Sequence, residues 1–109
     1  MIDYIELKKT KRPVKFGLNT LRIFSKQYEI TLTELGNLGD MTFDALLNLM
    51  YLGLSEGAKA DGQQFLASVD DVCDWLDESG KLDEMLTIFA DQFGGGGEDE
   101  GNQEAPAKG

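Results

Sequence analysis

The sequence of 109 residues has no histidine, one cysteine and two prolines, and these shortages limit the chemistry open to it. Histidine is the usual side chain for proton transfer at neutral pH and a principal ligand of zinc. The single cysteine, Cys73, excludes an internal disulfide and is typical of proteins from a reducing compartment. We therefore expect a cytoplasmic protein that is not an enzyme and that holds neither a metal ion nor a cofactor.

Two features that resemble reactive sites are better interpreted as structural. Cys73 falls on the apolar side of an expected helix, and without a histidine to activate it we interpret it as a buried structural thiol. The acidic segment "DDVCDWLDESGKLDE" does not fit the calcium-binding loop of an EF-hand. Placing Gly80 at the sixth position of that loop puts Trp75 first and Leu86 twelfth, where carboxylates are required.

Long apolar runs are also absent. The longest candidate, "ALLNLMYLGL", is interrupted by Asn48 and Gly53 and is too short to cross a bilayer. The N-terminal segment "MIDYIELKKTKR" places its basic residues after its apolar ones, and it has no apolar core of signal-peptide length. We expect no membrane partner and no secretion signal.

Charge is abundant but unevenly placed. The formal net charge is -10, so nucleic acid is not an expected partner. Seven of the ten basic residues lie within the first 27 positions, whereas all but two of the 20 acidic residues follow them. This segregation favours head-to-tail association between copies, or a partner with a complementary patch, although a solvated surface would have the same composition. The candidate self-association residues are Lys8, Lys9, Lys11, Arg12 and Lys15.

The first residues alternate in polarity on both sides of the basic segment "KKTKRP", which predicts a β-hairpin. Pro13 cannot donate a ladder hydrogen bond, so we expect it at an edge or at the entry of the second strand. The expected apolar positions are Ile2 and Tyr4, with Ile5 and Leu7 as further candidates, then Val14, Phe16 and Leu18.

Two short helices are expected next. Asn19 can cap the first, and Phe24 lies on its apolar face together with Leu21 and Tyr28. Thr31 stands three residues before Glu34, which is the spacing of a capping box and predicts a short helix that runs to Leu38.

The segment from Thr42 to Leu54 is predicted to be a helix with more apolar surface than one buried face requires. Either this helix lies at the centre of the fold, or its second face contacts another molecule. One stripe consists of Phe43, Leu46, Leu47, Met50 and Leu54. The second face, whose members are candidate partner-binding residues, consists of Ala45, Leu49 and Leu52. Residues 55–65, "SEGAKADGQQF", contain two glycines and are expected to form a loop.

Two amphipathic helices are expected to complete the domain. Ser68 can cap the first, and Gly80 ends it. Its inner face is formed by Val69, Val72, Cys73 and Leu76, and Trp75 lies off this stripe, either packed at the domain edge or anchoring an interface. The second has Leu82, Met85, Leu86, Phe89 and Phe93 at helical spacing. Trp75, Phe89 and Phe93 join the candidate partner-binding residues.

The expected fold class is mainly α, with an N-terminal β-hairpin followed by a compact bundle of four to five short helices. This domain is expected to cover residues 1–93. Residues 94–109 begin with four glycines, continue with acidic residues and contain no large apolar side chain. Such a segment cannot bury enough apolar area to offset its ordering entropy, so we expect a disordered tail.

The order of these elements resembles the tail assembly chaperones of long-tailed bacteriophages. The similarity covers about residues 14–93 and lies in the segments "VKFGLNTLRIFSKQYEITLTEL", "TFDALLNLMYLGLSEGAKADG" and "SVDDVCDWLDESGKLDEMLTIFADQF". It is a similarity of pattern: a strand leads into a helix, a short helix begins with threonine, a very apolar helix follows, and an acidic helix precedes the last one.

The resemblance implies a non-catalytic protein that binds the tape measure protein and keeps it soluble while the tail tube assembles. It also implies production in the host cytoplasm, absence from the mature virion, self-association into rings or spirals, and the tail tube protein as a further candidate partner. The glycine run at residues 94–97 would then mark a translational frameshift site, or else a solubilising tail. Two other classes stay open: an acidic inhibitor that mimics nucleic acid, and a structural head–tail or tail subunit.

Overall fold

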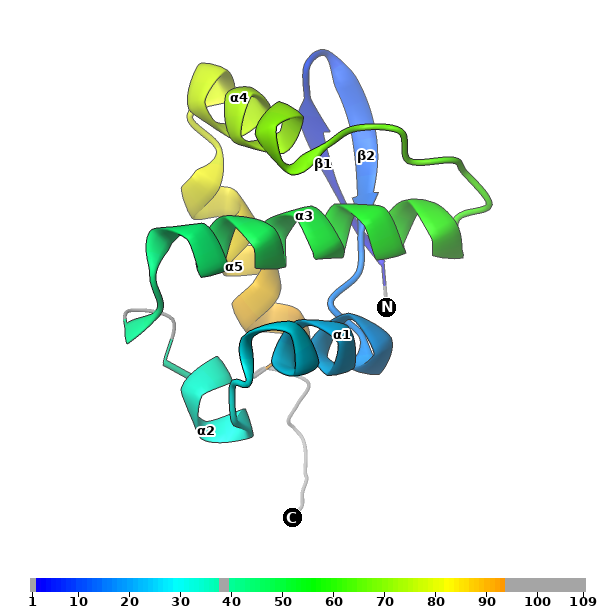
Figure 1. Ribbon diagram of the computed structural model, residues 1–109. Coiled ribbons are helices and arrows are strands. Elements are labelled where there is room, and N and C mark those ends of the chain that lie inside the picture. Colours follow the sequence, from blue (N-terminus) through cyan, green and yellow to red (C-terminus); the bar gives the residue numbers. More distant parts are fainter. Residues whose placement is uncertain (1, 38–39, 94–109) are drawn as a thin grey trace.

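The computed structural model describes residues 2–37 and 40–93, and within them the chain forms a β-hairpin followed by five helices (Figure 1). The predicted fold class is therefore confirmed, whereas the predicted disorder of residues 94–109 lies outside the described residues. The elements are β1 (Asp3–Leu7), β2 (Thr10–Val14), α1 (Leu18–Tyr28), α2 (Leu32–Leu35), α3 (Phe43–Ala60), α4 (Val69–Ser79) and α5 (Leu82–Phe93).

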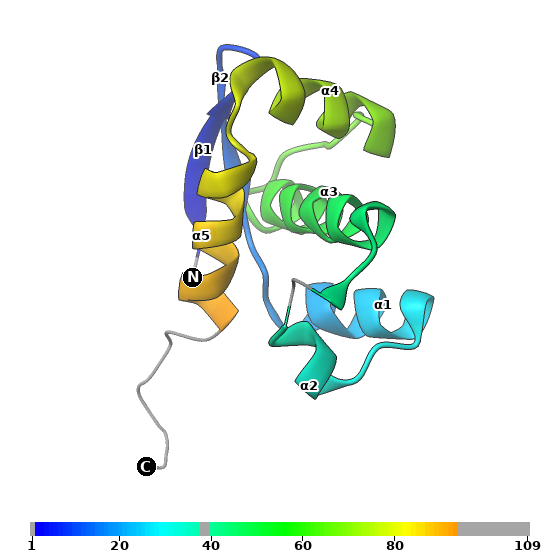
Figure 2. The ribbon, with the colours of Figure 1, turned by 90° about the vertical axis from the view of Figure 1, so that its left-hand side faces the viewer.

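The elements form two layers. Helices α4, α3 and α1 stack above one another in the first layer, and the hairpin and α5 form the second (Figure 2). Helix α3 contacts β2, α1 and α4, so it is enclosed on several sides. Residues of both its apolar faces are buried, including Ala45, Leu49, Met50 and Leu54. The structure therefore agrees with the first of the two interpretations: α3 lies at the centre of the fold.

The hairpin faces the core with Ile5 and Leu7, both fully buried, whereas Tyr4 is exposed. The antiparallel register pairs Tyr4 with Pro13, so alternation along β1 directs Ile5 and Leu7 to the opposite face. The prediction for Val14 and Phe16 is confirmed, because both are buried. The inward position predicted for Leu18 is wrong, because the chain turns at Gly17 and Leu18 begins α1.

The sequence predicts the cap of α2 correctly but not the cap of α1. The cap predicted at Asn19 is wrong, since α1 already begins at Leu18 and Gly17 precedes it without a side-chain cap. The capping box is confirmed: the Thr31 amide donates to Glu34 Oε1 (2.8 Å), and the Glu34 amide donates to Thr31 Oγ1 (3.2 Å). Helix α2 ends at Leu35, earlier than predicted, and residue 38 lies outside the described residues.

Helix α3 continues to Ala60, so the first half of the predicted loop at residues 55–65 is helical. The glycines that suggested a loop serve close packing instead. A Cβ atom at Gly57 would lie 2.3 Å from the carbonyl oxygen of Pro13, and one at Gly53 would lie 2.4 Å from the Phe16 ring. The Lys15 amide also donates to the Gly53 carbonyl (3.0 Å). Strand β2 therefore packs against a face of α3 that glycines form, where no side chain separates the two backbones.

The last two helices agree with the predicted caps. Ser68 and Asp71 form a capping box at the start of α4, and Gly80 ends that helix with φ +68. Near the C-terminal end of α5, the Gln92 side chain links that helix to the hairpin. The Gln92 side chain accepts a hydrogen bond from the Phe16 amide (2.7 Å) and donates to Asp3 Oδ2 (2.9 Å).

Candidate functional site

Three of the predicted partner-binding residues belong to the core. Ala45, Leu49 and Phe89 are at most 4% exposed, because the hairpin, α1 and α4 enclose α3, and α5 turns Phe89 towards Phe16. A contact through these side chains would require the domain to open, so they do not belong to a candidate binding surface. Leu52, Trp75 and Phe93 are half-buried and pack against the core.

Phe43 is a further exposed apolar residue that the sequence placed incorrectly. Its spacing predicts a place on the inner stripe of α3, yet 65% of its surface is exposed. Phe43 is the first residue of α3, and helical side chains lean towards the N-terminus of their helix. Its side chain is therefore directed past the packed middle of α3. The position of Phe43 in the first turn of the helix is the sequence feature from which its exposure could have been predicted.

Phe43 lines a cavity of about 440 Å³ at the place where α3 begins, α4 ends and α5 begins. These three helix ends lie together on the side of the molecule that faces the viewer in Figure 2. The left-handed turn at Gly80 changes the direction of the chain, so α5 leads away from the end of α4 (Figure 1). We call this cavity the acid-rimmed groove; its lining residues are Phe43, Leu47, Cys73, Asp74, Leu76, Asp77, Gly80, Leu82 and Asp83.

The acid-rimmed groove combines an apolar interior with negative charge at its edge. Leu76 is buried, Leu47 and Leu82 are half-buried, and the three carboxylates are exposed. None of its lining residues is a lysine or an arginine. A groove of this kind suits an apolar side chain that has cationic neighbours, because the carboxylates attract the cations while the apolar surfaces are removed from water.

Cys73 contributes to the groove as a neutral thiol. Burial raises the pKa of its thiol first, and the negative charges of Asp70, Asp74 and Asp44 raise it further. The thiolate, which is the nucleophilic form, is therefore disfavoured at neutral pH. The side chain is half-buried rather than buried as predicted, and this electrostatic setting still favours a packing role.

The basic hairpin contacts the acidic α4 of the same chain. Lys8 Nζ lies 3.5 Å from Glu78 Oε1, and the Arg12 guanidinium lies 3.9 Å from the centre of the Trp75 ring. Arg12 Nε also donates to the Leu7 carbonyl (3.0 Å), and burial lowers the pKa of the guanidinium. Arg12 and Trp75 are thus engaged with each other, which reduces their availability to a partner.

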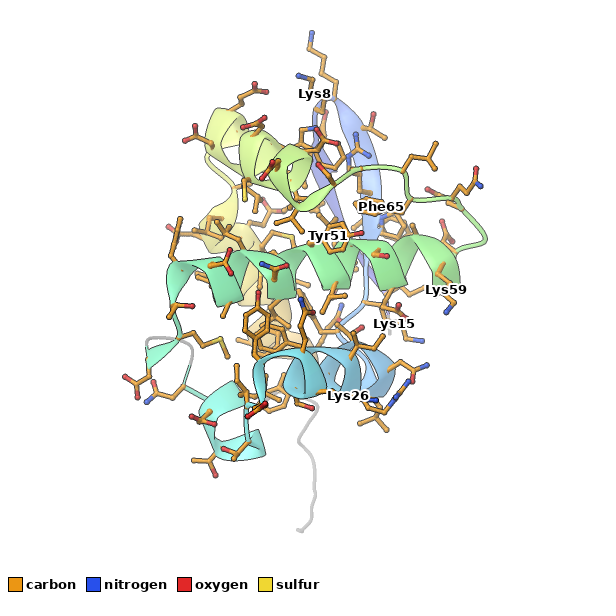
Figure 3. The ribbon with its side chains drawn as sticks, viewed as in Figure 1. Lys8, Lys15, Lys26, Tyr51, Lys59 and Phe65 are labelled. Carbon is orange, nitrogen blue, oxygen red and sulfur yellow. The ribbon has the colours of Figure 1, made fainter. Side chains whose placement is uncertain are left out.

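Trp75 belongs to a row of aromatic side chains that packs against α3. Its ring meets Phe65 edge to face at 6.2 Å, and Phe65 lies 5.7 Å from Tyr51 between ring centres. Figure 3 shows Tyr51 on α3 with Phe65 close to it, and Lys8 extending beyond the hairpin tip. Among the two interpretations of Trp75, packing at the domain edge agrees with these contacts.

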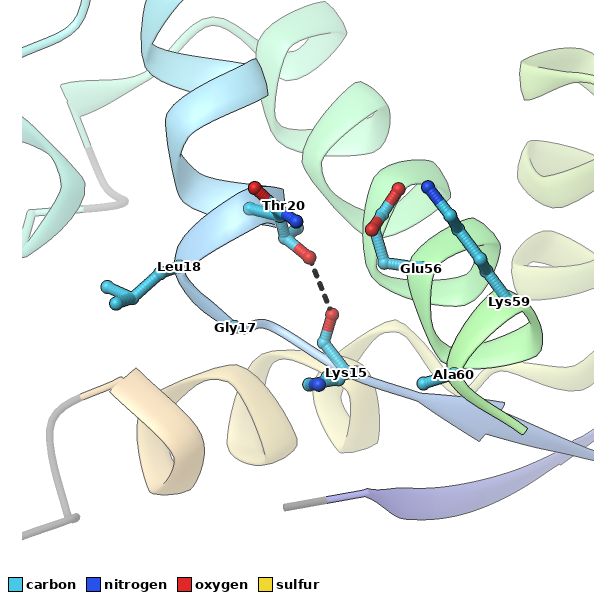
Figure 4. A pocket seen from close by; sticks show the side chains of 8 residues that line it. Lys15, Gly17, Leu18, Thr20, Glu56, Lys59 and Ala60 are labelled. Atoms are coloured by element: carbon cyan, nitrogen blue, oxygen red, sulfur yellow. Dashed lines mark hydrogen bonds between the residues drawn. The ribbon is translucent and has the colours of Figure 1, made fainter. Parts of the chain in front are cut away.

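Lys15 lies away from the other predicted self-association residues. It lines a second cavity of about 490 Å³ between the start of α1 and the end of α3 (Figure 4). The Thr20 hydroxyl donates a hydrogen bond to the Lys15 carbonyl (2.8 Å), which fixes the segment between β2 and α1. The lining residues are Lys15, Gly17, Leu18, Asn19, Thr20, Glu56, Lys59 and Ala60. Lys8, Lys9 and Lys11 remain exposed at the hairpin.

Comparisons with protein-family models, with curated proteins and with solved structures each gave no match for this chain. The resemblance to tail assembly chaperones therefore stays a prediction. In residues 2–37 and 40–93, no helix is both long enough and apolar enough to span a bilayer. The same ranges hold no group of three histidine, cysteine or acidic side chains placed to share a metal ion.

Proposed function

We propose that this chain is a non-catalytic tail assembly chaperone that binds its client through the acid-rimmed groove. The observation that carries the proposal is Phe43, a large apolar side chain left 65% exposed beside a groove whose lining residues include no lysine or arginine. The order of elements from about residue 14 to residue 93 supports the choice of family. The client is the tape measure protein, with the tail tube protein as a further candidate, and binding takes place in the host cytoplasm before the virion is complete.

The groove suits a client that would otherwise aggregate through apolar side chains. Phe43, Leu47 and Leu82 offer apolar contact area, so an apolar client residue placed there leaves water. The carboxylates at the edge stay in solvent and keep the complex charged. Because the chain as a whole has a net charge of -10, many copies along one client repel further aggregation.

Co-expression with the longest tail gene product of the same phage tests this function. We expect wild-type protein to keep that product in the soluble fraction, and Phe43→Asp to lose most of this effect because a carboxylate replaces the apolar anchor. Leu66→Asp is the matched control, since Leu66 is 84% exposed and lies beyond the far end of α3. Equal rescue by Phe43→Asp and wild type would rule out the groove as the client site.

An acidic inhibitor of a host enzyme is the second candidate, because α4 exposes a series of carboxylates along its length. Asp70, Asp71, Asp74 and Asp77 are all exposed on that helix, as a mimic of a phosphate backbone requires. Tight binding to a host nuclease, without any rescue of the tail product, would favour this function. A structural subunit is a third class, and recovery of the chain from purified virions would favour it over a chaperone.

A further inference from the structure

A group of cations lies around the cavity between the start of α1 and the end of α3. Lys15 and Lys59 line the two sides of this cavity (Figure 4). Leu18 lines it too, and Arg22 and Lys26 follow Leu18 at intervals of four residues, so they extend the basic character along the same side of α1. We call Lys15, Arg22, Lys26 and Lys59 the α1 basic surface.

The α1 basic surface has no ion-pair partner within the described part of the chain. Across residues 2–37 and 40–93, the one ion pair joins Lys8 to Glu78 at the hairpin tip. Among the residues that line the cavity, Glu56 is the one carboxylate, and it is half-buried. Like charges gathered on one surface repel each other, so an anionic segment that binds there relieves the repulsion.

Helix α5 ends beside this surface. Gln92 Oε1 accepts a hydrogen bond from the Phe16 amide (2.7 Å), and Gln92 Nε2 donates to the Val14 carbonyl (3.2 Å). Lys15 lies between these two residues in the sequence. Figures 1 and 2 both show α5 ending at the level of α1. The chain therefore leaves its last described helix close to Lys15.

The sequence beyond α5 has the opposite charge. Four glycines separate Phe93 from Glu98, Asp99 and Glu100, which we call the acidic run. We propose that the acidic run binds the α1 basic surface of the same chain. A glycine-rich segment of five residues spans about 12 Å on average and at most about 18 Å, so the run reaches Lys15 and the cavity beside it.

The short connection makes a weak contact effective. A single exposed ion pair contributes little, because two charged side chains lose freedom and salt screens their attraction. Here three carboxylates are held near four cations by a short linker, which sets an effective concentration in the millimolar range. The run needs no apolar side chain for this contact. Its composition, unsuited to a packed core, is therefore suited to a charged surface.

Other surfaces fit the acidic run less well. Asp74, Asp77 and Asp83 rim the groove and repel it. Lys9 and Lys11 are exposed cations, but the hairpin tip is at the opposite end of β2 from Val14 and thus from the end of α5 (Figure 1). When the run occupies the α1 basic surface, any other polyanion has to compete with it. The inference involves this chain alone and is independent of the proposed client.

Paramagnetic broadening in the full chain tests the contact. A nitroxide is attached to Gly101→Cys, directly after the acidic run, in a chain that also carries Cys73→Ala. We expect amide signals from Gly17 to Thr20 to be about twofold weaker than in the same labelled chain with Glu98→Gln, Asp99→Asn and Glu100→Gln. The linker is identical in both chains, so nearness due to the linker alone cancels. In 1 M salt, where the screening length is about 3 Å, the difference should vanish.

Two pairs of substitutions in the labelled chain with the acidic run intact locate the contact. Lys15→Gln with Lys59→Gln should abolish the extra broadening. Lys9→Gln with Lys11→Gln removes the same charge at the hairpin and should preserve it. Circular dichroism should show unchanged helix content in every variant.

Three results would each overturn the proposal. The first is equal broadening with and without the three carboxylates, and the second is equal loss from both lysine pairs. The third is broadening that arises only when nitroxide-labelled chains are mixed with separate isotope-labelled chains, which would assign the contact to two copies. Because no client is present, none of these results decides the proposed function.

Discussion

At Gly57 the backbones of α3 and β2 approach so closely that no side chain fits between them. A Cβ atom there would lie 2.3 Å from Pro13 O and 2.7 Å from the Val14 amide nitrogen. Backbone atoms cannot rotate aside as a side chain does, so the strand itself would have to shift. Gly57 therefore sets the distance between the hairpin and the central helix.

Replacing Gly57 by alanine should destabilise the protein. Alanine adds about 1 kcal/mol of helix propensity, but overpacking a tight contact costs about 1–3 kcal/mol, and a clash with backbone belongs at the upper end. Chemical denaturation measures the difference. Gly36→Ala is the control, because among residues 2–37 and 40–93 its Cβ atom would meet only Thr33 O, at 3.4 Å. A Gly57→Ala variant as stable as wild type would contradict the close packing described here.

Cys73 provides a second test at the scale of one residue. Because burial and nearby carboxylates raise the pKa of its thiol, the folded protein holds less thiolate at neutral pH than the unfolded chain does. We expect alkylation by iodoacetamide to be slow in the folded state, to become faster as pH rises, and to be faster in denaturant at every pH below the folded pKa. Folded protein that reacts at neutral pH as rapidly as the denatured chain would show that Cys73 is an activated thiol.

The contact between hairpin and α4 is the clearest test at the scale of elements. Arg12 lies over the Trp75 ring at 3.9 Å, and the two residues come from elements far apart in the sequence. In a double-mutant cycle with Arg12→Ala and Trp75→Leu, we expect a coupling energy of about 0.5–1 kcal/mol. Unfolding in denaturant measures each corner of the cycle. Additive effects of the two substitutions would mean that the stacking stabilises neither element.

The sequence predicted the elements well where local patterns decide them. The hairpin, the capping box at Thr31, the cap at Ser68 and the turn at Gly80 depend on neighbouring residues, and all of them are present. The sequence did not predict the structure correctly where that structure depends on contacts between residues far apart in the chain. Gly53 and Gly57 indicate a loop in isolation, and only the approach of β2 explains why they belong to a helix.

The candidate site was less predictable than the fold, for the same reason. Helical periodicity gives the angle of a residue around its own helix but not what lies beyond the helix end. Phe43 and Leu49 looked alike as apolar residues of one helix, yet α3 buries Leu49 in its middle and exposes Phe43 at its first turn. The groove also needs residues from α4 and α5, and no pattern within a single helix predicts their meeting.

At the scale of the whole molecule, the separation of charge differs from what the sequence order suggested. The basic hairpin is turned towards α4 of its own chain, with Lys8 beside Glu78 and Arg12 on Trp75. Other cations stay exposed both on the hairpin, at Lys9 and Lys11, and at Arg22 and Lys26 of α1. The basic and acidic parts of the sequence are therefore partly in contact with each other within one chain.

The central claim is that a partner binds at the acid-rimmed groove. Backbone amide shifts of isotope-labelled wild-type protein test this claim directly while overlapping peptides of the proposed client are added. We predict that at least one peptide shifts the amides at the start of α3, the end of α4 and the start of α5 more than all others. Peptides that bind only at α1 or the hairpin, or no binding by any peptide, would contradict the account.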